Sequence, residues 1–328
     1  MDISSKRLIT RSVREAAGAL LAGQLVAIPT ETVYGLAADA TNPKAVASVF
    51  ALKGRPADHP LIVHCSSAAE AWQCVQVVTS AARRLADAFW PGPLTLVLPR
   101  SAAISPAITG GQASVAIRVP DHSLTQQLLV AIERPLVAPS ANLFGRVSPT
   151  SAAHVRDEFP DTPLLILDGG PCDVGIESTI VDCRSDASVR ILRPGKITQQ
   201  HLVEELGEGC LDAAETAPVR VSGALPAHYA PQAQVILLAA SELSRWCESH
   251  ARAALPTLLI TTAPPPPREI PAGIKWHSVS TDTSQFAREM YALFRRADRE
   301  SCQRIVVELP SAEGIGLALR DRLQRAAN

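Results

Sequence analysis

Short apolar runs recur along the first 200 residues, and they constrain the fold of this chain more than any other feature. Each run is four to seven residues long, the length of a buried strand, and segments of helical periodicity such as DHSLTQQLLVAI and TSAAHVRDEF separate several of them. The runs span residues 25–29, 61–64, 94–99, 114–120, 136–140, 164–168, 178–183 and 189–192. This alternation predicts an α/β domain built around a large mixed sheet.

Two helices are marked by capping signals. Ser12 and Glu15 form an S-x-x-E capping box before a segment whose apolar residues repeat at helical spacing up to Gly23. Asn42 is placed to cap a second helix, and Pro43 suits its first position because proline needs no hydrogen bond there. Both signals predict helices that cover the sheet.

Length and a change of composition predict two domains. A chain of 328 residues exceeds what one core usually organises. After ITQQHLVEEL the sequence becomes rich in Gly, Ala, Pro and small polar residues, and strand and helix patterns then alternate again from AQVILLAA to the end. We expect a first domain over residues 1–207, a connector over 208–232 and a small parallel α/β domain over 233–328.

Charge, cysteine usage and missing motifs exclude several protein classes. The net charge of −1 and pI near 6.7 give no global basic field for nucleic-acid binding. The seven cysteines form no C-x-x-C pair, which argues against a zinc site and favours reduced thiols. No phosphate-binding P-loop, dinucleotide glycine motif, G-x-S-x-G elbow or H-E-x-x-H motif occurs. Without a signal-peptide pattern or a long apolar span, we expect a cytoplasmic protein.

Polar side chains gather where the apolar runs stop. In an open α/β sheet the strand ends form the ligand crevice, so these residues are expected to converge on one site. Guanidinium groups and hydroxyls there suit phosphate or carboxylate groups. The residues are Thr30, Thr32, Tyr34, Lys53, Arg55, His64, Arg118, Ser140, Asn142, Ser148, Ser178, Thr179 and Arg193.

Each of these residues taken singly also has a structural explanation. Arg118 alone would more often form an ion pair at an edge, although a charge within a buried run is costly without an anion. His64 alone would more often be a satisfied core histidine. Lys53 and Arg55 are also suited to the carboxyl end of a helix, where the dipole favours cations.

The order of the motifs narrows the choice. PTETVYGL, KGRP followed by HPLIVH, WPGPLTLVL, VAIRVP, APSAN, ESTIVD, LRPG and SGALPAHYAP occur in this sequence between residues 29 and 231. Together they resemble the long, two-domain form of the L-threonylcarbamoyladenylate synthase family. The resemblance implies a YrdC-like domain, in which a twisted, mixed open sheet surrounds a concave cationic cavity, followed by a small Rossmann-like domain of parallel strands.

The resemblance also implies a reaction and its partners. Members of this family condense L-threonine, bicarbonate or CO2, and ATP into threonylcarbamoyl-AMP and release pyrophosphate. Other proteins then transfer the product to an adenosine beside the anticodon of tRNAs that read ANN codons. Magnesium is expected to arrive with ATP and to be held by phosphates and water rather than by protein ligands.

Motif by motif, the resemblance assigns roles to individual residues. It places the threonine against Thr32, His64, Arg118, Ser178 and the backbone near Ala138. Lys53 and Arg55 would spread the charge of the reaction, and Tyr229 would cover the nucleotide as part of a connector that acts as a lid. The nucleotide itself would contact Arg55, His59, Ser140, Asn142, Ser148, Arg193 and Tyr229.

Two rival functions remain at this level. An RNA-binding module is one, because the pocket would be locally basic; the lack of aromatic stacking platforms argues against it. A carbamoyl-adenylate enzyme that uses carbamoyl phosphate is the other. Such domains normally accompany zinc-finger-like segments, which this chain lacks.

Overall fold

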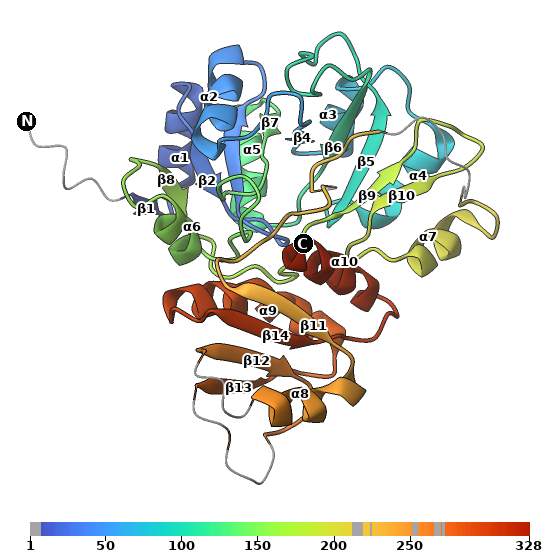
Figure 1. The fold of residues 1–328 in the computed structure, drawn as a ribbon. Coiled ribbons are helices and arrows are strands. Elements are labelled where there is room, and N and C mark those ends of the chain that lie inside the picture. Colours follow the sequence, from blue (N-terminus) through green and yellow to red (C-terminus); the bar gives the residue numbers. More distant parts are fainter. Residues whose placement is uncertain (1–7, 212–218, 224, 251–254, 266–269, 271–272) are drawn as a thin grey trace, which may run out of the picture. The chain divides into compact units, whose positions relative to one another are not determined.

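The computed structural model describes residues 8–211, 219–223, 225–250, 255–265, 270 and 273–328, and its contacts divide the chain into two compact units (Figure 1). The first unit comprises Met1–Phe144 and Ser148–Ala224, and the second comprises Gly145–Val147 and Leu225–Asn328. No described helix is both long and apolar enough to cross a membrane.

The strands of the first unit form one ten-stranded mixed sheet in the order β1-β8-β2-β3-β7-β4-β6-β5-β9-β10. All eight predicted runs contain a strand, which confirms the mixed α/β prediction. The strands are β1 (Ile9–Thr10), β2 (Val26–Ile28), β3 (Gly35–Asp39), β4 (Ile62–His64), β5 (Leu94–Pro99), β6 (Ser114–Arg118), β7 (Leu136–Val137), β8 (Leu165–Leu167), β9 (Thr179–Asp182) and β10 (Arg190–Arg193).

Helices of the first unit begin where the capping signals predict. The Ser12 hydroxyl accepts a hydrogen bond from the Glu15 N–H at the start of the first helix, and Asn42 caps the second with Pro43 in its first turn. The first and fifth helices pack against each other, as do the fourth and seventh (Figure 1). The helices are α1 (Val13–Leu21), α2 (Pro43–Lys53), α3 (Ala68–Gln73), α4 (Ser80–Phe89), α5 (Ser123–Ile132), α6 (Ala152–Glu158) and α7 (Gln199–Leu206).

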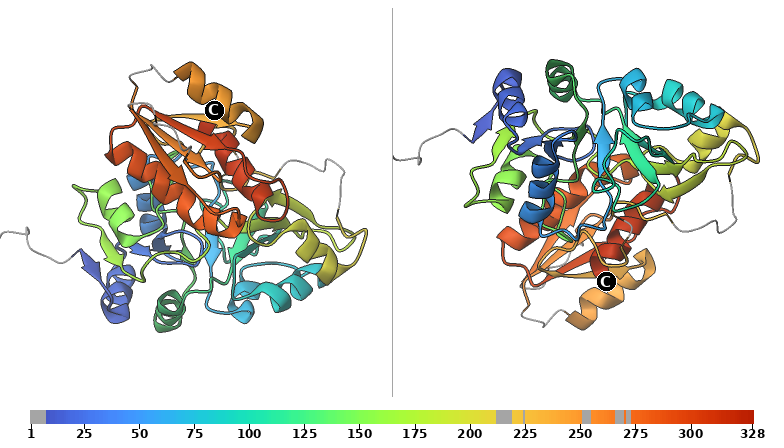
Figure 2. Two further views of the ribbon diagram at one scale, coloured as in Figure 1. Left: turned by 90° about the horizontal axis from the view of Figure 1, so that it is seen from below. Right: turned by 90° about the horizontal axis from the view of Figure 1, so that it is seen from above.

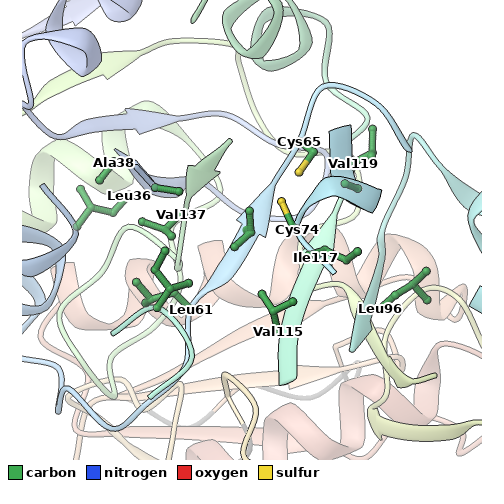
Figure 3. Packing of buried hydrophobic residues seen from close by; sticks show 14 of the residues in the cluster. Leu36, Ala38, Leu61, Cys65, Cys74, Leu96, Val115, Ile117, Val119 and Val137 are labelled. Atoms are coloured by element: carbon green, nitrogen blue, oxygen red, sulfur yellow. The ribbon is translucent and has the colours of Figure 1, made fainter. Parts of the chain in front are cut away.

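The part of the sheet formed by β4, β6, β5 and β9 has two different faces. Alternate residues such as Val63, Leu96 and Ile117 point into the large apolar core of this unit, part of which is shown in Figure 3. The residues between them form a smaller apolar patch, which consists of Ile62, Val97, Ala116 and Ile180 together with Val221 of the connector. This second face is the one that carries the functional candidates.

The second unit has a four-stranded parallel sheet in the order β11-β14-β12-β13, which confirms the predicted small parallel α/β domain. Leu243 and Trp246 of α8 pack against Leu259 and Val306 on one face, and Figure 2 shows α9 and α10 on the other side of the strands. The elements are β11 (Gln234–Leu238), η1 (Ala240–Glu242), α8 (Leu243–His250), β12 (Thr257–Thr261), β13 (Ile274–Ser278), α9 (Thr283–Arg299), β14 (Arg304–Glu308) and α10 (Gly316–Ala327).

Candidate functional site

Two predicted residues, His64 and Arg118, and one further residue, Thr95, share one face of the sheet at neighbouring positions. His64 and Arg118 are register partners in the parallel pair β4 and β6. The register between the antiparallel strands β5 and β6 pairs Leu96 with Ile117, so one residue further on Thr95 lies opposite Arg118. Because side chains alternate between faces, all three project from the side that carries the Ile62–Ala116 patch.

Arg118 is a buried cation held on three sides. Its Nη2 lies 2.5 Å from Oε1 of Glu31, and its Nη1 donates to the Thr32 hydroxyl at 2.9 Å. Its Nε donates to the carbonyl oxygen of Gly92 at 3.2 Å. Glu31 is itself buried, and neither of its carboxylate oxygens accepts a hydrogen bond from a described residue that meets full geometric criteria. The PTET segment therefore supplies both a counter-charge and a hydroxyl to one guanidinium group.

His64 is a neutral imidazole in this environment. Burial, and secondarily the charge of Arg118, lower the pKa of His64 from 6.5 to about 3. Its Nδ1 lies 3.2 Å from the carbonyl oxygen of Ile62, which can only accept, so Nδ1 carries the proton and Nε2 is left as an acceptor. The side chain thus offers a hydrogen-bond acceptor next to a cation.

Ser178 and Arg193 are joined beside this group. The hydroxyls of Ser178 and Thr95 lie 2.7 Å apart. Arg193 donates from Nη2 to the Ser178 hydroxyl at 3.1 Å and from Nε and Nη2 to the Ser178 carbonyl oxygen at 3.1 and 2.9 Å. Strand β5, which carries Thr95, therefore lies between Arg118 on β6 and the Ser178–Arg193 pair at β9 and β10.

The connector links Arg193 to Arg55. Arg193 Nη1 donates to the carbonyl oxygen of Ser222 at 2.8 Å, and Arg55 Nη2 donates to the Ser222 hydroxyl at 3.2 Å. The Arg55 guanidinium also lies 5.7 Å from the centre of the Phe144 ring. The His59 ring packs against Phe144 in a T-shaped arrangement, with the two ring centres 5.2 Å apart. Two of the predicted cations therefore meet at one residue that sequence reasoning did not single out.

Lys53 and the APSAN segment form a third group. The Lys53 ammonium donates to the carbonyl oxygens of Ser140 and Asn142, so it ties the end of α2 to this segment. Burial and then the charge of Arg55 hold the pKa of Lys53 well below its usual value. The Ala138 N–H donates to the Ile62 carbonyl oxygen at 3.1 Å, which joins the same segment to the strand that ends in His64.

Ser148 lies near a second buried carboxylate. Its hydroxyl donates to Oε1 of Glu177 at 2.7 Å. Among the described residues, no three His, Cys, Asp or Glu side chains gather as they would to hold a metal ion.

Two hydroxyls of the PTETVYGL motif have structural roles. Thr30 accepts from the Val33 N–H at 3.2 Å and donates to the Val33 carbonyl oxygen at 2.6 Å, which closes the turn that presents Glu31 and Thr32. Tyr34 is fully buried and donates to the carbonyl oxygen of Gly170 at 2.8 Å. Burial raises the pKa of Tyr34, so the phenol stays protonated.

Tyr229 belongs to the second unit. It is buried there with a backbone φ of 64°, its ring lies 5.8 Å from that of Tyr291, and the Arg322 guanidinium lies 5.4 Å from its ring centre. Within this unit it anchors the end of the connector, and its contact with a nucleotide stays a prediction.

Sequence reasoning missed Thr95 and Ser222. Thr95 is a lone hydroxyl within the apolar run PLTLVLP, and the argument used for Arg118 would have found it. Ser222 follows the alternating VRV pattern, in which Val221 faces the patch and Arg220 faces solvent. That alternation is the signal that would have predicted an extended connector packed on the sheet.

The fold and the buried side chains define the class of protein. The site has four buried cations, Lys53, Arg55, Arg118 and Arg193. The residues that they contact on adjacent strands and in the connector link them to one another. An open mixed sheet with such a set of linked, buried cations is an α/β protein suited to anionic ligands.

Comparisons with known proteins define the family. A model described as "Telomere recombination" matches residues 18–195, and one described as "Threonylcarbamoyl-AMP synthase, C-terminal domain" matches residues 197–328. Threonylcarbamoyl-AMP synthase of Pyrococcus abyssi is 36% identical over 98% of this chain and 96% of its own length. The enzyme of Bacillus subtilis is 36% identical over 96% of this chain and 92% of its own length.

Solved structures agree with the sequence comparisons. The crystal structure of P. abyssi Sua5 complexed with L-threonine matches with a TM-score of 0.87 and 34% identity, and covers 96% of this chain and 94% of that one. The chain belongs to the threonylcarbamoyl-AMP synthase family.

Proposed function

We propose that this protein condenses L-threonine, bicarbonate or CO2, and ATP into threonylcarbamoyl-AMP with release of pyrophosphate. Membership of the family supports the reaction, as do full-length relatives named for it. The observation that carries the proposal in this chain is the pairing of Arg118 with Glu31 beside Thr32 and His64. A buried cation and a buried anion side by side match the two charges of a free amino acid.

Arg118 would bind the threonine carboxylate. A guanidinium group can hold both oxygens of a carboxylate at once, and Thr32 and Gly92 already fix its plane. Glu31 would hold the threonine ammonium group, because its Oε2 accepts no hydrogen bond from a described residue. Ser178 and the Nε2 acceptor of His64 would serve the threonine hydroxyl, with the backbone near Ala138 closing the other side.

The remaining cations would hold ATP. Lys53 fixes Ser140 and Asn142 through their carbonyl oxygens, so it would act on the nucleotide partly by shaping the APSAN segment. Arg55 and Arg193 would lie along the phosphates. His59 packs beside the Phe144 ring and would contact the nucleotide, and Ser148 would add a hydroxyl.

Magnesium would enter with ATP on its phosphates. Of the two buried carboxylates near the site, Glu31 pairs with Arg118 and Glu177 accepts from Ser148, so both already have partners in the protein. Mg²⁺ commonly keeps several waters and binds substrate phosphates. Bound there, it would neutralise charge on the departing pyrophosphate.

The chemistry needs positioning rather than a covalent enzyme intermediate. The threonine ammonium group would lose a proton, and the free amine would capture CO2 as a carbamate with release of a second proton. A carbamate oxygen would then attack the α-phosphorus in line with the leaving pyrophosphate. Arg118 and Glu31 would hold the amino acid still, while Lys53 and Arg55 stabilise the charge that develops on the phosphates. Buried donors do this well because their interactions are not weakened by water.

The chain would divide into a catalytic domain over residues 1–207, a connector over 208–232 and a small α/β domain over 233–328. The connector would act as a lid over the site. Val221 packs on the sheet patch and Ser222 meets Arg55 and Arg193, so residues 219–223 lie against the groups assigned to ATP. A lid at this position would keep water from a reactive mixed anhydride. The product would pass to tRNA-modifying proteins in the cytoplasm.

The assignment is tested by incubating the purified protein with ATP, bicarbonate and L-threonine and measuring pyrophosphate. Release is expected to require threonine; threonine-independent release would refute the assignment. Replacing threonine and bicarbonate by carbamoyl phosphate tests the rival enzyme, and binding that weakens steeply with salt and ignores threonine would indicate an RNA-binding module.

Arg118→Lys tests the site map. Lysine keeps the charge but loses the planar fork, so the KM for threonine is expected to rise by roughly 10- to 100-fold, the cost of one or two charged hydrogen bonds. Arg134→Lys is the matched control, because Arg134 is a half-exposed arginine that pairs with Asp39. Equal KM values in both variants would refute the map.

A further inference from the structure

Two cysteines of the first unit lie with their sulfur atoms facing each other. Cys65 directly follows β4, and Cys74 is the C-cap residue of α3. Figure 3 shows the two sulfurs pointing toward one another across the core, and the Cys74 thiol donates to the carbonyl oxygen of Glu70 at 3.8 Å. Both side chains are buried and both thiols are free.

The pair has an approach route on the Cys74 side. Cys74 lines a cavity of about 510 Å³ together with Thr41, Ser66 and Glu70, whereas Cys65 does not. The neighbouring Cys65 thiol lowers the pKa of Cys74, whereas the Cys74 thiol and burial raise the pKa of Cys65. Cys74 is therefore the thiol placed to react first, because the thiolate is the nucleophile.

The hydrogen bonds around the pair lead to the threonine side of the site. The Cys65 N–H donates to the carbonyl oxygen of Arg118 at 2.9 Å, and His64 precedes it on β4. At the other end, Glu70 of α3 accepts from the N–H and the hydroxyl of Ser66, so α3 is already tied to the residue after Cys65. A movement of Cys65 toward Cys74 would pull on the end of β4 and on its bond to Arg118.

We propose that Cys65 and Cys74 form a reversible disulfide when the protein meets a peroxide, and that this disulfide weakens threonine binding. In the first step the Cys74 sulfur attacks hydrogen peroxide, an S–O bond forms, the O–O bond breaks, and water leaves. In the second step the Cys65 sulfur attacks the resulting sulfenic acid, an S–S bond forms, the S–O bond breaks, and a second water leaves with the Cys65 proton. A dithiol reductant restores both thiols.

The expected size of the effect follows from geometry. An S–S bond is roughly 2 Å long, shorter than any contact between two unbonded sulfur atoms, so the two residues must move together. Misplacing a positioning group by about 1 Å can cost up to 100-fold in rate. We expect the oxidised protein to show a KM for threonine raised by roughly 10- to 100-fold, with the KM for ATP much less changed. This consequence rests on the threonine contacts proposed above, while disulfide formation itself does not.

The experiment treats the full-length protein with hydrogen peroxide, blocks the remaining thiols, and maps cross-linked peptides by mass spectrometry. A peptide pair joined through Cys65 and Cys74 that disappears with dithiothreitol is expected. Oxidation confined to other cysteines would overturn the proposal, and this readout needs neither activity nor a variant.

Activity then tests the coupling. Wild type is expected to lose threonine affinity with peroxide and to regain it with dithiothreitol, whereas Cys74→Ser keeps its affinity throughout. Cys210→Ser is the matched control, because Cys210 is a half-exposed thiol of the same unit, and it should respond like wild type. A mapped disulfide without a change in the KM for threonine, or protection by Cys210→Ser, would overturn the coupling.

Discussion

Val221→Ala is expected to release the connector from the sheet without unfolding the first unit. Val221 is 8% exposed and packs on Ile62, Val97 and Ala116. Removing two methyl groups from this contact costs about 1.6 kcal/mol of burial. A small cavity already lies beside these residues, so the gap will not close fully and the total rises to about 2.4 kcal/mol. The open fraction of the connector should therefore increase roughly 15- to 60-fold.

Limited trypsin digestion measures this opening. Cleavage after Arg220 requires the connector to leave the sheet, because Arg220 N–H and carbonyl groups both bond the Gln112 side chain. Cleavage after Arg118, which is buried in β6, reports global unfolding and serves as the internal reference. Val77→Ala is the matched control, since Val77 is 56% exposed. If cleavage after Arg220 is no faster in Val221→Ala than in Val77→Ala, the docking of the connector is wrong.

Two further predictions concern stability. Gly195→Ala should destabilise the first unit by about 2 kcal/mol, because a Cβ there would lie 2.5 Å from the Thr179 nitrogen. Gly18→Ala should instead stabilise it by about 0.5 kcal/mol, because nothing lies within 4 Å of a Cβ at that position. Equal urea midpoints for the two variants would contradict both predictions. Since the pKa of His64 is lowered to about 3, the unfolded state binds more protons below pH 6.5, so native stability falls as pH drops toward 3. The stability advantage of wild type over His64→Gln should shrink by up to about 1.4 kcal/mol per pH unit in that window; a constant difference in urea titrations would refute this.

Two of the strands that sequence patterns missed, β3 and β13, share a physical cause. β3 has the sequence GLAAD, and small residues with little β-propensity do not stand out even though every position is buried. β13, IKWHS, is buried only at Ile274 and mixes charged and polar residues with apolar ones. Both strands exist because their neighbours supply hydrogen bonds and cover, which no local pattern records.

The site was predictable where a polar group interrupts a buried run. Arg118 and His64 were found in this way, and the structure makes them register partners. What local sequence did not contain is which carbonyl or carboxylate satisfies each donor. Ser222 is more than 160 residues from Arg55, and its contact depends on how the connector returns to the sheet.

The way in which the cations are satisfied bears on how the site would bind anions. Each of the four donates to main-chain carbonyl oxygens: Lys53 to Ser140 and Asn142, Arg55 to Pro60, Arg118 to Gly92, and Arg193 to Ser178 and Ser222. A carbonyl dipole meets the hydrogen-bonding need of a buried donor but does not cancel its charge. The positive potential therefore remains available to a phosphate or carboxylate, and little rearrangement is needed when the ligand arrives. Carboxylate partners in place of these carbonyl groups would have neutralised the four cations, and an anionic ligand would have had to displace them. Glu31 beside Arg118 is the exception, and it suits an amino acid, whose ammonium group brings a positive charge to that place.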